Sequence, residues 1–455
     1  MKLTLLWTDI MVWGLVIVVL LWSWKLSDSS QVKKQWRSIF RSSIAMASAI
    51  ILAFYLLFTL MDSVHFRLAK SGIGTQTEQI QYGKMQSFLD LLFAHNIDNA
   101  ERTYSAPFAT HEYTKSIVVD DDGVSRQVNL PLKYVSSDTS ISRKSLEALF
   151  FGVMLSFLLI SLHILWRAEG KWLQTLKQTA RGETELPWRT AYLTLMTMIL
   201  AFTWLYVLSY DYHVLGTDKV GGDVLYQSLK SIRTGVLIGV LTTLVMLPVS
   251  ILLGVSAGLF GGWVDDVIQY LYTTLSSIPG VLLIAAGVLM MQVMMDNNPE
   301  WFETTLERSD LRLLFLILIL GITSWTGLCR LLRAETLKIS QVEYVTAAKA
   351  FGVSKFMIIR RHIIPNLMHI ILISVVLDFS GLVLAEAVLS YVGVGVDPTM
   401  YSWGNMINQA RLEMAREPMV WWSLFSAFVF MFILVLAANL LSDRVQKVLD
   451  PRNKV

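Results

Sequence analysis

The chain has 455 residues, of which 54% are hydrophobic and only 16% are charged, whereas soluble domains carry about 25% charged residues. This composition is that of a membrane protein, and the formal net charge of +3 gives no reason to expect a nucleic acid as partner. Its single cysteine, Cys329, excludes an intrachain disulfide.

One bilayer crossing needs about 20 apolar residues, and the chain contains roughly nine such runs. They lie near Ile10–Trp24, Ser43–Met61, Leu149–Trp166, Ala191–Ser209, Thr234–Leu259, Ser277–Met295, Leu313–Leu331, Leu367–Tyr391 and Trp421–Leu441. We therefore expect an all-α polytopic membrane protein. The first run lacks a small-residue cleavage site, so we interpret it as an uncleaved anchor.

The run at Ser277–Met295 is less regular, because it contains Pro279 and Gly280 and because hydrophobicity already begins near Val267. A proline within a span kinks a helix. Two structures remain open for this region. It is either a short interfacial helix that leads into a kinked span or one long tilted helix.

The distribution of basic residues predicts how the chain is oriented. With an external N-terminus, four of the five internal segments carry several Lys or Arg, whereas the external loop Asp296–Arg312 is mostly acidic. The exception is Phe260–Asp266, which has no basic residue. The positive-inside rule therefore predicts an external N-terminus and a cytoplasmic C-terminus.

A segment of soluble composition, from Asp62 to Ser145, separates the second and third spans. In it, Ser116–Leu130 has two partly alternating runs around Asp-Asp-Gly, a hairpin signal. Thr77–His95 has apolar residues at helical spacing. We expect a small external α+β domain and divide the chain into anchor helices (1–61), external domain (62–147), a third helix with a linker (148–189) and a membrane core (190–455).

Within the core, the stretch Glu343–Pro365 reads EYVTAAKAFGVSKFMIIRRHIIP. Tyr344, Ala347, Ala348 and Phe351 follow helical spacing and predict one apolar face of mostly small residues. Gly352 suits a helix end with a left-handed backbone, a second short basic helix follows, and Pro365 suits the first turn of the next span. The pattern predicts a rigid cytoplasmic elbow. Spacing alone fits an amphipathic loop on the lipid head groups equally well.

This stretch resembles the EAA loop of ABC importer permeases. Thr346, Ala347, Ala348, Gly352 and Pro365 occupy positions of that pattern, with Thr346 in place of its Glu. The ending R-H-x-x-P-N looks like the dipeptide/oligopeptide branch. Three further stretches resemble landmarks of that branch: Gly216, Thr217, Asp218, Gly221 and Asp223 match G-T-D-x-x-G-R-D with Gly222 in place of Arg, and Phe260–Gln269 and Leu384–Ile407 follow in the expected order.

The resemblance covers about His213 to Arg452 and implies a six-helix permease core, to which about three N-terminal helices and the external domain are added. It implies a multi-pass protein of the bacterial inner membrane. Its implied partners are a second homologous permease, two cytoplasmic ABC ATPases that bind ATP and Mg²⁺, an external binding protein and a peptide substrate. The residues implied to couple to the ATPase are Glu343, Tyr344, Thr346, Ala347, Ala348, Phe351, Gly352, Arg361 and Pro365.

Asp378 and Glu386 lie within the eighth span, where an unpaired carboxylate costs at least a few kcal/mol. They either line a translocation path or pair with helix ends or a neighbouring subunit. No P-loop occurs, and His111-Glu112 lacks the second His of a zinc pair, so we expect neither catalysis, nor a metal, nor a cofactor in this chain. Two other functions stay open: a membrane-anchored sensor or scaffold, and a channel that needs no ATP.

Overall fold

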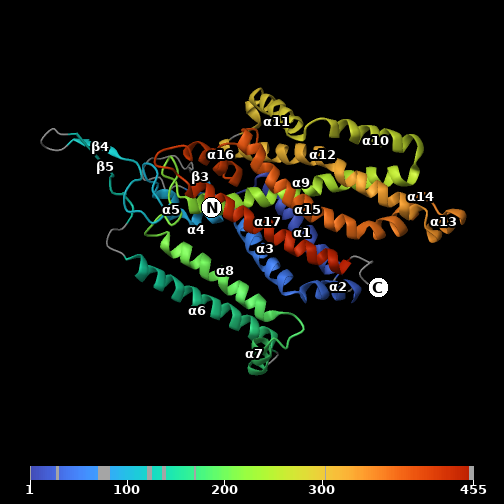
Figure 1. Ribbon diagram of the computed structural model, residues 1–455, viewed down its shortest axis with the longest axis horizontal. Coiled ribbons are helices and arrows are strands. Elements are labelled where there is room, and N and C mark those ends of the chain that lie inside the picture. Colours follow the sequence, from blue (N-terminus) through green and yellow to red (C-terminus); the bar gives the residue numbers. More distant parts are fainter. Residues whose placement is uncertain are drawn as a thin grey trace, which may run out of the picture. The chain divides into compact units, whose positions relative to one another are not determined.

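The computed structural model describes residues 2–26, 30–69, 82–119, 125–135, 140–168, 171–302 and 304–449, and most of these are helical (Figure 1). Within these ranges, eight helices are long and apolar enough to cross a membrane, and one bent helix pair brings the number to nine. The long helices are α1 (Trp7–Leu26), α3 (Ser43–Asp62), α6 (Ile141–Arg167), α8 (Trp188–Leu208), α9 (Val224–Phe260), α12 (Thr305–Ser340), α15 (Ile364–Val392) and α17 (Trp422–Leu449). The all-α polytopic fold is thereby confirmed.

The bent pair decides between the two structures considered for the sixth span. Helices α10 (Gly262–Ser277) and α11 (Gly280–Asp296) meet at an angle of 87°. Pro279 precedes α11, and Ile278 before it is extended because a proline disfavours helical backbone at the preceding residue. One long tilted helix is therefore wrong, and a short helix that leads into an apolar helix after the proline is correct.

The chain divides into two compact units. Unit 1 comprises Met1–Gly235 and Tyr401–Leu441, and unit 2 comprises Val236–Met400 and Ser442–Val455. In unit 1, α6 and α8 lie side by side, and α8 also packs on α3 (Figure 1). Shorter helices complete this unit: α2 (Ser30–Phe40), α4 (Phe88–Leu92), α5 (Ala94–Asp98), α7 (Trp172–Arg181) and α16 (Trp403–Glu413).

The described part of the external segment contains both strands and helices, as expected for an α+β domain. An antiparallel sheet has the order β1-β2-β3, in which β1 (Lys2–Thr4) at the start of the chain pairs with β2 (His65–Ala69), and β2 pairs with β3 (Tyr82–Ser87). The N-terminus therefore lies on the same side of unit 1 as this domain. The sequence patterns contained no signal for β1.

The helix predicted over Thr77–His95 is wrong over 82–87 and is confirmed, as two short helices, from Phe88 onward. Residues 82–87 form strand β3, and helices α4 and α5 follow. The helix begins only at Phe88, because the Ser87 hydroxyl accepts from the Asp90 N–H at 3.2 Å and the Asp90 carboxylate accepts from the Ser87 N–H at 2.9 Å. This capping box fixes the start of the helix. The part of the prediction over 77–81 lies outside the described residues.

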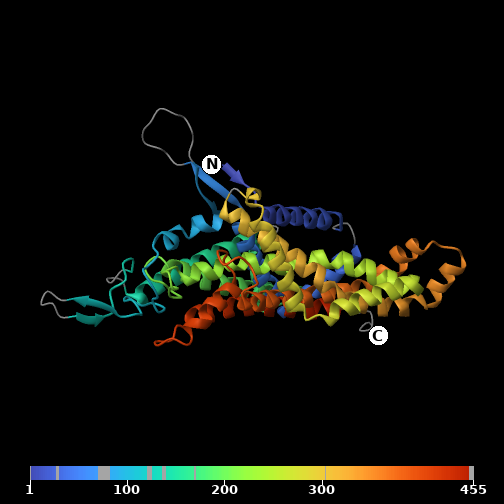
Figure 2. The same ribbon diagram turned by 90° about the horizontal axis from the view of Figure 1, so that it is seen from above.

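The hairpin predicted in Ser116–Leu130 is confirmed in its strands. β4 (Ser116–Val119) and β5 (Ser125–Val128) pair antiparallel with Ser116 opposite Val128, and both views show them extending away from the helices of unit 1 (Figure 2). The expected turn at 120–124 lies outside the described residues.

Unit 2 contains α10, α11, α12, α15 and the part of α9 from Val236 to Phe260. It also contains the short helices α13 (Glu343–Ala350) and α14 (Lys355–Ile358) and a 3₁₀ turn at Pro299–Trp301. Here α9 and α12 approach closely at two glycines one turn apart. A Cβ at Gly254 would lie 2.7 Å from the Cys329 carbonyl oxygen, and one at Gly258 would lie 2.6 Å from the Thr336 Cβ. This small-xxx-small spacing lets two membrane helices bring their backbones together.

We predict that Gly258→Ile separates α9 from α12 and lowers the stability of the detergent-solubilised protein by about 1–3 kcal/mol, the usual cost of overpacking a closely packed contact. Thermal unfolding followed by circular dichroism measures the loss. Gly327→Ala on α12 is the matched control, because a Cβ there meets nothing within 4 Å. Equal melting temperatures for the two variants would contradict the close contact.

Candidate functional site

Helix α13 forms the first arm of the predicted elbow and ends as the sequence indicates. Gly352 has φ +74°, its N–H donates to the Lys349 carbonyl at 3.0 Å, and the Val353 N–H donates to the Ala348 carbonyl at 3.1 Å. These two bonds constitute a Schellman motif, which needs a left-handed residue at this position. The predicted role of Gly352 as a helix terminator is confirmed.

Three apolar side chains anchor the elbow in the core of unit 2. Val345 of α13, Ile358 of α14 and Ile363 are all completely buried in one hydrophobic cluster with residues of α9, α10, α12 and α15. Ala348 packs partly against the same cluster, so this member of the predicted apolar face points inward. The elbow is thus part of the folded core and is more than a loop resting on a surface.

Polar contacts brace the elbow further. The Asn366 amide donates to the Tyr344 hydroxyl at 2.9 Å, and the rings of Tyr344 and His362 are 5.7 Å apart. The Lys349 ammonium donates to the Ser340 carbonyl at the end of α12 at 3.1 Å. Each arm is therefore tied to the other arm or to a neighbouring helix.

An ion pair fastens α10 to the C-terminal part of α12. The Arg333 guanidinium donates to both carboxylate oxygens of Asp265, at 2.5 and 2.6 Å. Paired hydrogen bonds of this kind fix orientation as well as distance. Beside this pair, the Lys355 ammonium lies 4.8 Å from the centre of the Phe260 ring. Asp265 thus supplies a charge contact at a turn where the sequence has no basic residue.

The outer surface of the elbow is unusually apolar for an exposed segment. Phe351 is 86% exposed and Phe356 is 73% exposed, and Tyr344 is also exposed. Both views place α13 and α14 at the end of unit 2, beyond α10 (Figure 2). The remaining predicted coupling residues that are exposed are Glu343, Thr346, Ala347, Gly352, Arg361 and Pro365. Exposed aromatic side chains on a rigid segment are typical of a protein contact surface.

The second arm of the elbow differs from the prediction. A separate short helix before a new span is wrong, because α14, a π-helical turn at Ile359–Ile363 and α15 form one continuous helix from Lys355 to Val392. In that turn the Ile364 N–H donates to the Ile359 carbonyl five residues earlier. A wider turn makes room for the Pro365 ring, which would clash with an ordinary helical carbonyl.

The motif at Gly216–Asp223 forms a turn that holds the domain predicted to be external. The Thr217 hydroxyl accepts from the Ser105 N–H at 2.6 Å and donates to the Thr103 carbonyl at 2.9 Å. Gly216 and Gly221 both have positive φ, and a Cβ at Gly221 would lie only 1.8 Å from the Glu101 carbonyl oxygen. Because only glycine permits this approach, these residues act as a structural joint.

The two carboxylates of this motif, Asp218 and Asp223, accept hydrogen bonds from neighbouring residues. Asp218 accepts from the Gly222 N–H at 2.8 Å and from the Gln227 amide at 2.6 Å. Asp223 accepts from the Tyr226 N–H at 3.0 Å and pairs with His213 at 2.9 Å. Neither carboxylate is therefore available as a simple ligand for substrate.

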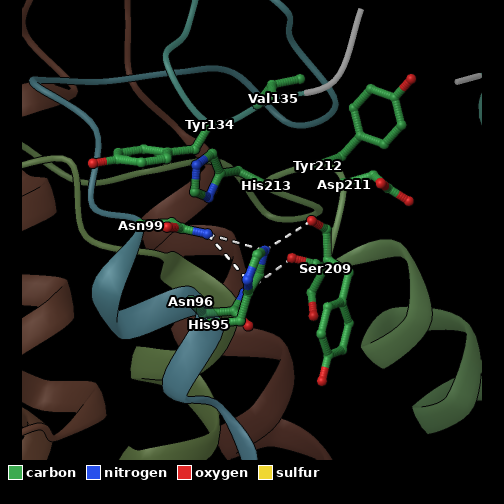
Figure 3. Close-up of a pocket in the computed structure, with 10 residues that line it drawn as sticks. His95, Asn96, Asn99, Tyr134, Val135, Ser209, Asp211, Tyr212 and His213 are labelled. Atoms are coloured by element: carbon green, nitrogen blue, oxygen red, sulfur yellow. Dashed lines mark hydrogen bonds between the residues drawn. The ribbon is translucent and has the colours of Figure 1, made fainter. Parts of the chain in front are cut away.

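A small pocket lies beside this turn. Figure 3 shows it between His95, Asn96, Asn99, Tyr134 and His213, and its volume is about 10 Å³. That is room for about one water molecule. The pocket is therefore too small for a peptide. No group of three His, Cys, Asp or Glu that could hold a metal occurs in the described ranges.

The structure keeps the two carboxylates of the eighth span apart. Asp378 and Glu386 both lie on α15, and eight residues of helix separate them by about 12 Å along its axis. Glu386 is 2% exposed and accepts from the Ser390 hydroxyl at 2.7 Å. Asp378 is partly buried, and its Oδ2 atom has no hydrogen-bond partner among the described residues. The two carboxylates therefore cannot share one bound cation, and Asp378 is the less satisfied of the two.

Sequence reasoning missed a buried ionic network in unit 1. The Arg233 guanidinium donates to Asp9 at 2.7 Å, and Asp9 also contacts His65 at 2.8 Å. The Lys230 ammonium lies 3.0 Å from Asp62 and also pairs with Asp90. The network joins α1, α3, β2, α4 and the start of α9. No local sequence pattern indicates it, because the partners of each ion pair lie far apart in the sequence.

Asp90 shows how the network holds its charges. Burial disfavours the ionised carboxylate, but the Lys230 ammonium and the hydrogen bonds from Lys230, Ser87 and Tyr226 favour it and hold the pKa of Asp90 below its ordinary value. Asp90 is thus ionised and pairs with Lys230 as a full charge.

We predict that Lys230→Met destabilises the protein by about 3 kcal/mol, because it leaves Asp62 and Asp90 buried without their cation. Guanidinium or thermal unfolding in detergent measures the change. Lys219→Met, at an exposed position of the adjacent turn, is the control and should leave stability unchanged. The network would not be stabilising if both variants unfolded at the same point.

The sequence of this chain is similar to those of known transport proteins. Residues 250–455 match the model of the family described as "Binding-protein-dependent transport system inner membrane component". The dipeptide transport system permease protein of Bacillus subtilis (strain 168) is 30% identical over 240 residues, which cover 53% of this chain and 69% of that protein.

Two further relatives have the same extent of similarity. The oligopeptide transport system permease protein of Mycobacterium tuberculosis (strain ATCC 25618 / H37Rv) is 31% identical over 242 residues, 53% of this chain and 77% of that protein. The glutathione transport system permease protein of Pectobacterium atrosepticum is 31% identical over 242 residues, 53% of this chain and 73% of that protein.

Proposed function

Because the chain belongs to the family of binding-protein-dependent permeases of ABC importers, in its dipeptide and oligopeptide branch, we propose that it forms half of a translocation pathway and that its elbow couples this pathway to ATP hydrolysis. It is a multi-pass protein of the inner membrane and a permease subunit. In this proposal, ATP and Mg²⁺ bind to two cytoplasmic ATPase subunits, and a second permease and an external binding protein complete the transporter.

The observation that carries the proposal is the elbow of unit 2. It combines exposed Phe351 and Phe356 with buried anchors at Val345 and Ile358, and its second arm runs without a break into α15. A surface that docks a motor must be exposed, yet it must resist bending if it is to transmit movement. The elbow meets both requirements. Closure of the ATPases would therefore tilt α15 as a rigid body and open the pathway to one side of the membrane.

The proposed substrate is a dipeptide or oligopeptide, in line with the names of the relatives. Asp378 is our candidate for contact with the transported molecule, because its Oδ2 atom has no hydrogen-bond partner among the described residues. A peptide ammonium would supply the missing partner. Glu386 is instead assigned a structural role, since Ser390 already donates to it.

We expect Gly352→Val to leave membrane insertion intact and to uncouple ATP hydrolysis from uptake, because φ +74° is strained for a β-branched residue and the turn would reorient Phe351. Phe351→Ala should weaken the docking itself. The assay is peptide uptake and ATP hydrolysis by the complete transporter in proteoliposomes, measured in parallel.

Phe157→Ala on α6, which truncates a phenylalanine of 72% exposure in a membrane span, is the matched control and should transport normally. Normal uptake by both elbow variants would remove the basis for the coupling role.

The proposed orientation has its own test. Ser125→Cys in β5 and Ala350→Cys in α13 each place an exposed thiol in a protein whose only natural cysteine, Cys329, is completely buried. In right-side-out membrane vesicles, an impermeant maleimide should label Ser125→Cys at once and Ala350→Cys only after the vesicles are opened. The reverse order of labelling would show that the chain has the opposite orientation in the membrane.

A further inference from the structure

Unit 1 contains an apolar cavity of about 250 Å³ among four membrane-spanning helices. Its lining comes from α3, α8, α9 and α17 and from Leu215 in the loop before α9. The volume exceeds that of the engineered cavity of about 150 Å³ that takes up benzene. An unfilled cavity of this size would destabilise the protein, because the side chains that line it would lose dispersion contacts.

The lining offers nothing to a polar occupant. Nearly all of it is hydrocarbon, and its two hydroxyl groups are already used: Tyr55 donates to the Phe430 carbonyl at 2.8 Å, and Ser426 donates to the Trp422 carbonyl at 2.7 Å. Water is therefore not retained there. A transported peptide would leave its amide groups without partners in such a cavity, which excludes it as well.

The membrane around these helices supplies one abundant apolar group, the acyl chain of a lipid. The helices that form the walls are long and apolar enough to cross the hydrocarbon layer, and the cavity is only partly enclosed. Among its walls, α3 belongs to the predicted anchor helices (1–61), whereas α8, α9 and α17 belong to the predicted membrane core (190–455). The cavity is thus a seam between the anchor helix α3 and the core within unit 1.

We propose that this seam is a lipid-binding site, in which one acyl chain of a membrane phospholipid fills the space between α8 and α17. Phe202 and Phe54 line the wall with rings 5.9 Å apart, and Ala201 is the small residue that leaves the room. The lipid would act as a structural ligand that packs the anchor helix α3 onto the core. The inference is independent of the coupling role of the elbow.

The test uses palmitic acid that carries a diazirine and an alkyne and is incorporated by cells into their phospholipids. The intact transporter is purified, exchanged extensively into lipid-free detergent, irradiated and digested, and the labelled peptides are identified by mass spectrometry. We expect label on residues 198–205 and 425–433 that survives the detergent exchange. Loss of this label on exchange, or its absence in the assembled complex, would overturn the proposal and would leave the seam to a protein segment or to loosely held lipid.

Two filling variants sharpen the result. Ala201→Trp and Val429→Phe should each lower the retained label at these peptides by about tenfold, the loss expected when roughly two methylene contacts are displaced. Phe157→Trp, on the exposed face of α6, is the control and should retain it. Undiminished label in both filling variants would contradict an acyl chain inside the cavity.

Discussion

The functional account depends on the unbroken helix from Lys355 to Val392. Proline would normally end such a helix, because its ring collides with the carbonyl four residues earlier and its nitrogen carries no hydrogen. Here the Ile364 N–H reaches back to Ile359, which widens one turn just before Pro365 and keeps the chain helical. In the proposed mechanism, this continuous helix would pass a movement of α14 on to the membrane part of α15.

Unit 1 is organised by a different constraint, the cost of burying charge. Asp9, Asp62 and Asp90 lie in unit 1 with Lys230 and Arg233, and each carboxylate has a cation within the network. A buried pair tolerates little displacement, since separating the partners leaves a charge without water. The added N-terminal helices and the external domain are thereby fixed to the start of α9, and the glycine-rich turn at Gly216–Asp223 holds the domain from the other side.

Sequence patterns predicted the parts of this protein that local chemistry determines. The apolar runs gave the spans, Gly352 gave the end of α13, and alternation gave the β4–β5 hairpin. These patterns failed where contacts with distant segments of the chain determine the structure. Tyr82–Ser87 became a strand because β2 pairs with it, and Lys230 and Arg233 lie inside a helix because carboxylates from other helices neutralise them. The continuity through Pro365 could not be predicted either, since a π turn has no sequence signature comparable to that of a cap.

The most direct test of the account is to replace Phe351 with the photoreactive residue benzoylphenylalanine and to identify what it crosslinks in native membranes. Phe351 is 86% exposed on the elbow, so the reactive group samples whatever contacts that surface. The account predicts an adduct with a P-loop ATPase and its loss when Gly352 is also replaced by valine. Adducts with lipid alone, or with a regulatory protein that lacks a P-loop, would contradict it.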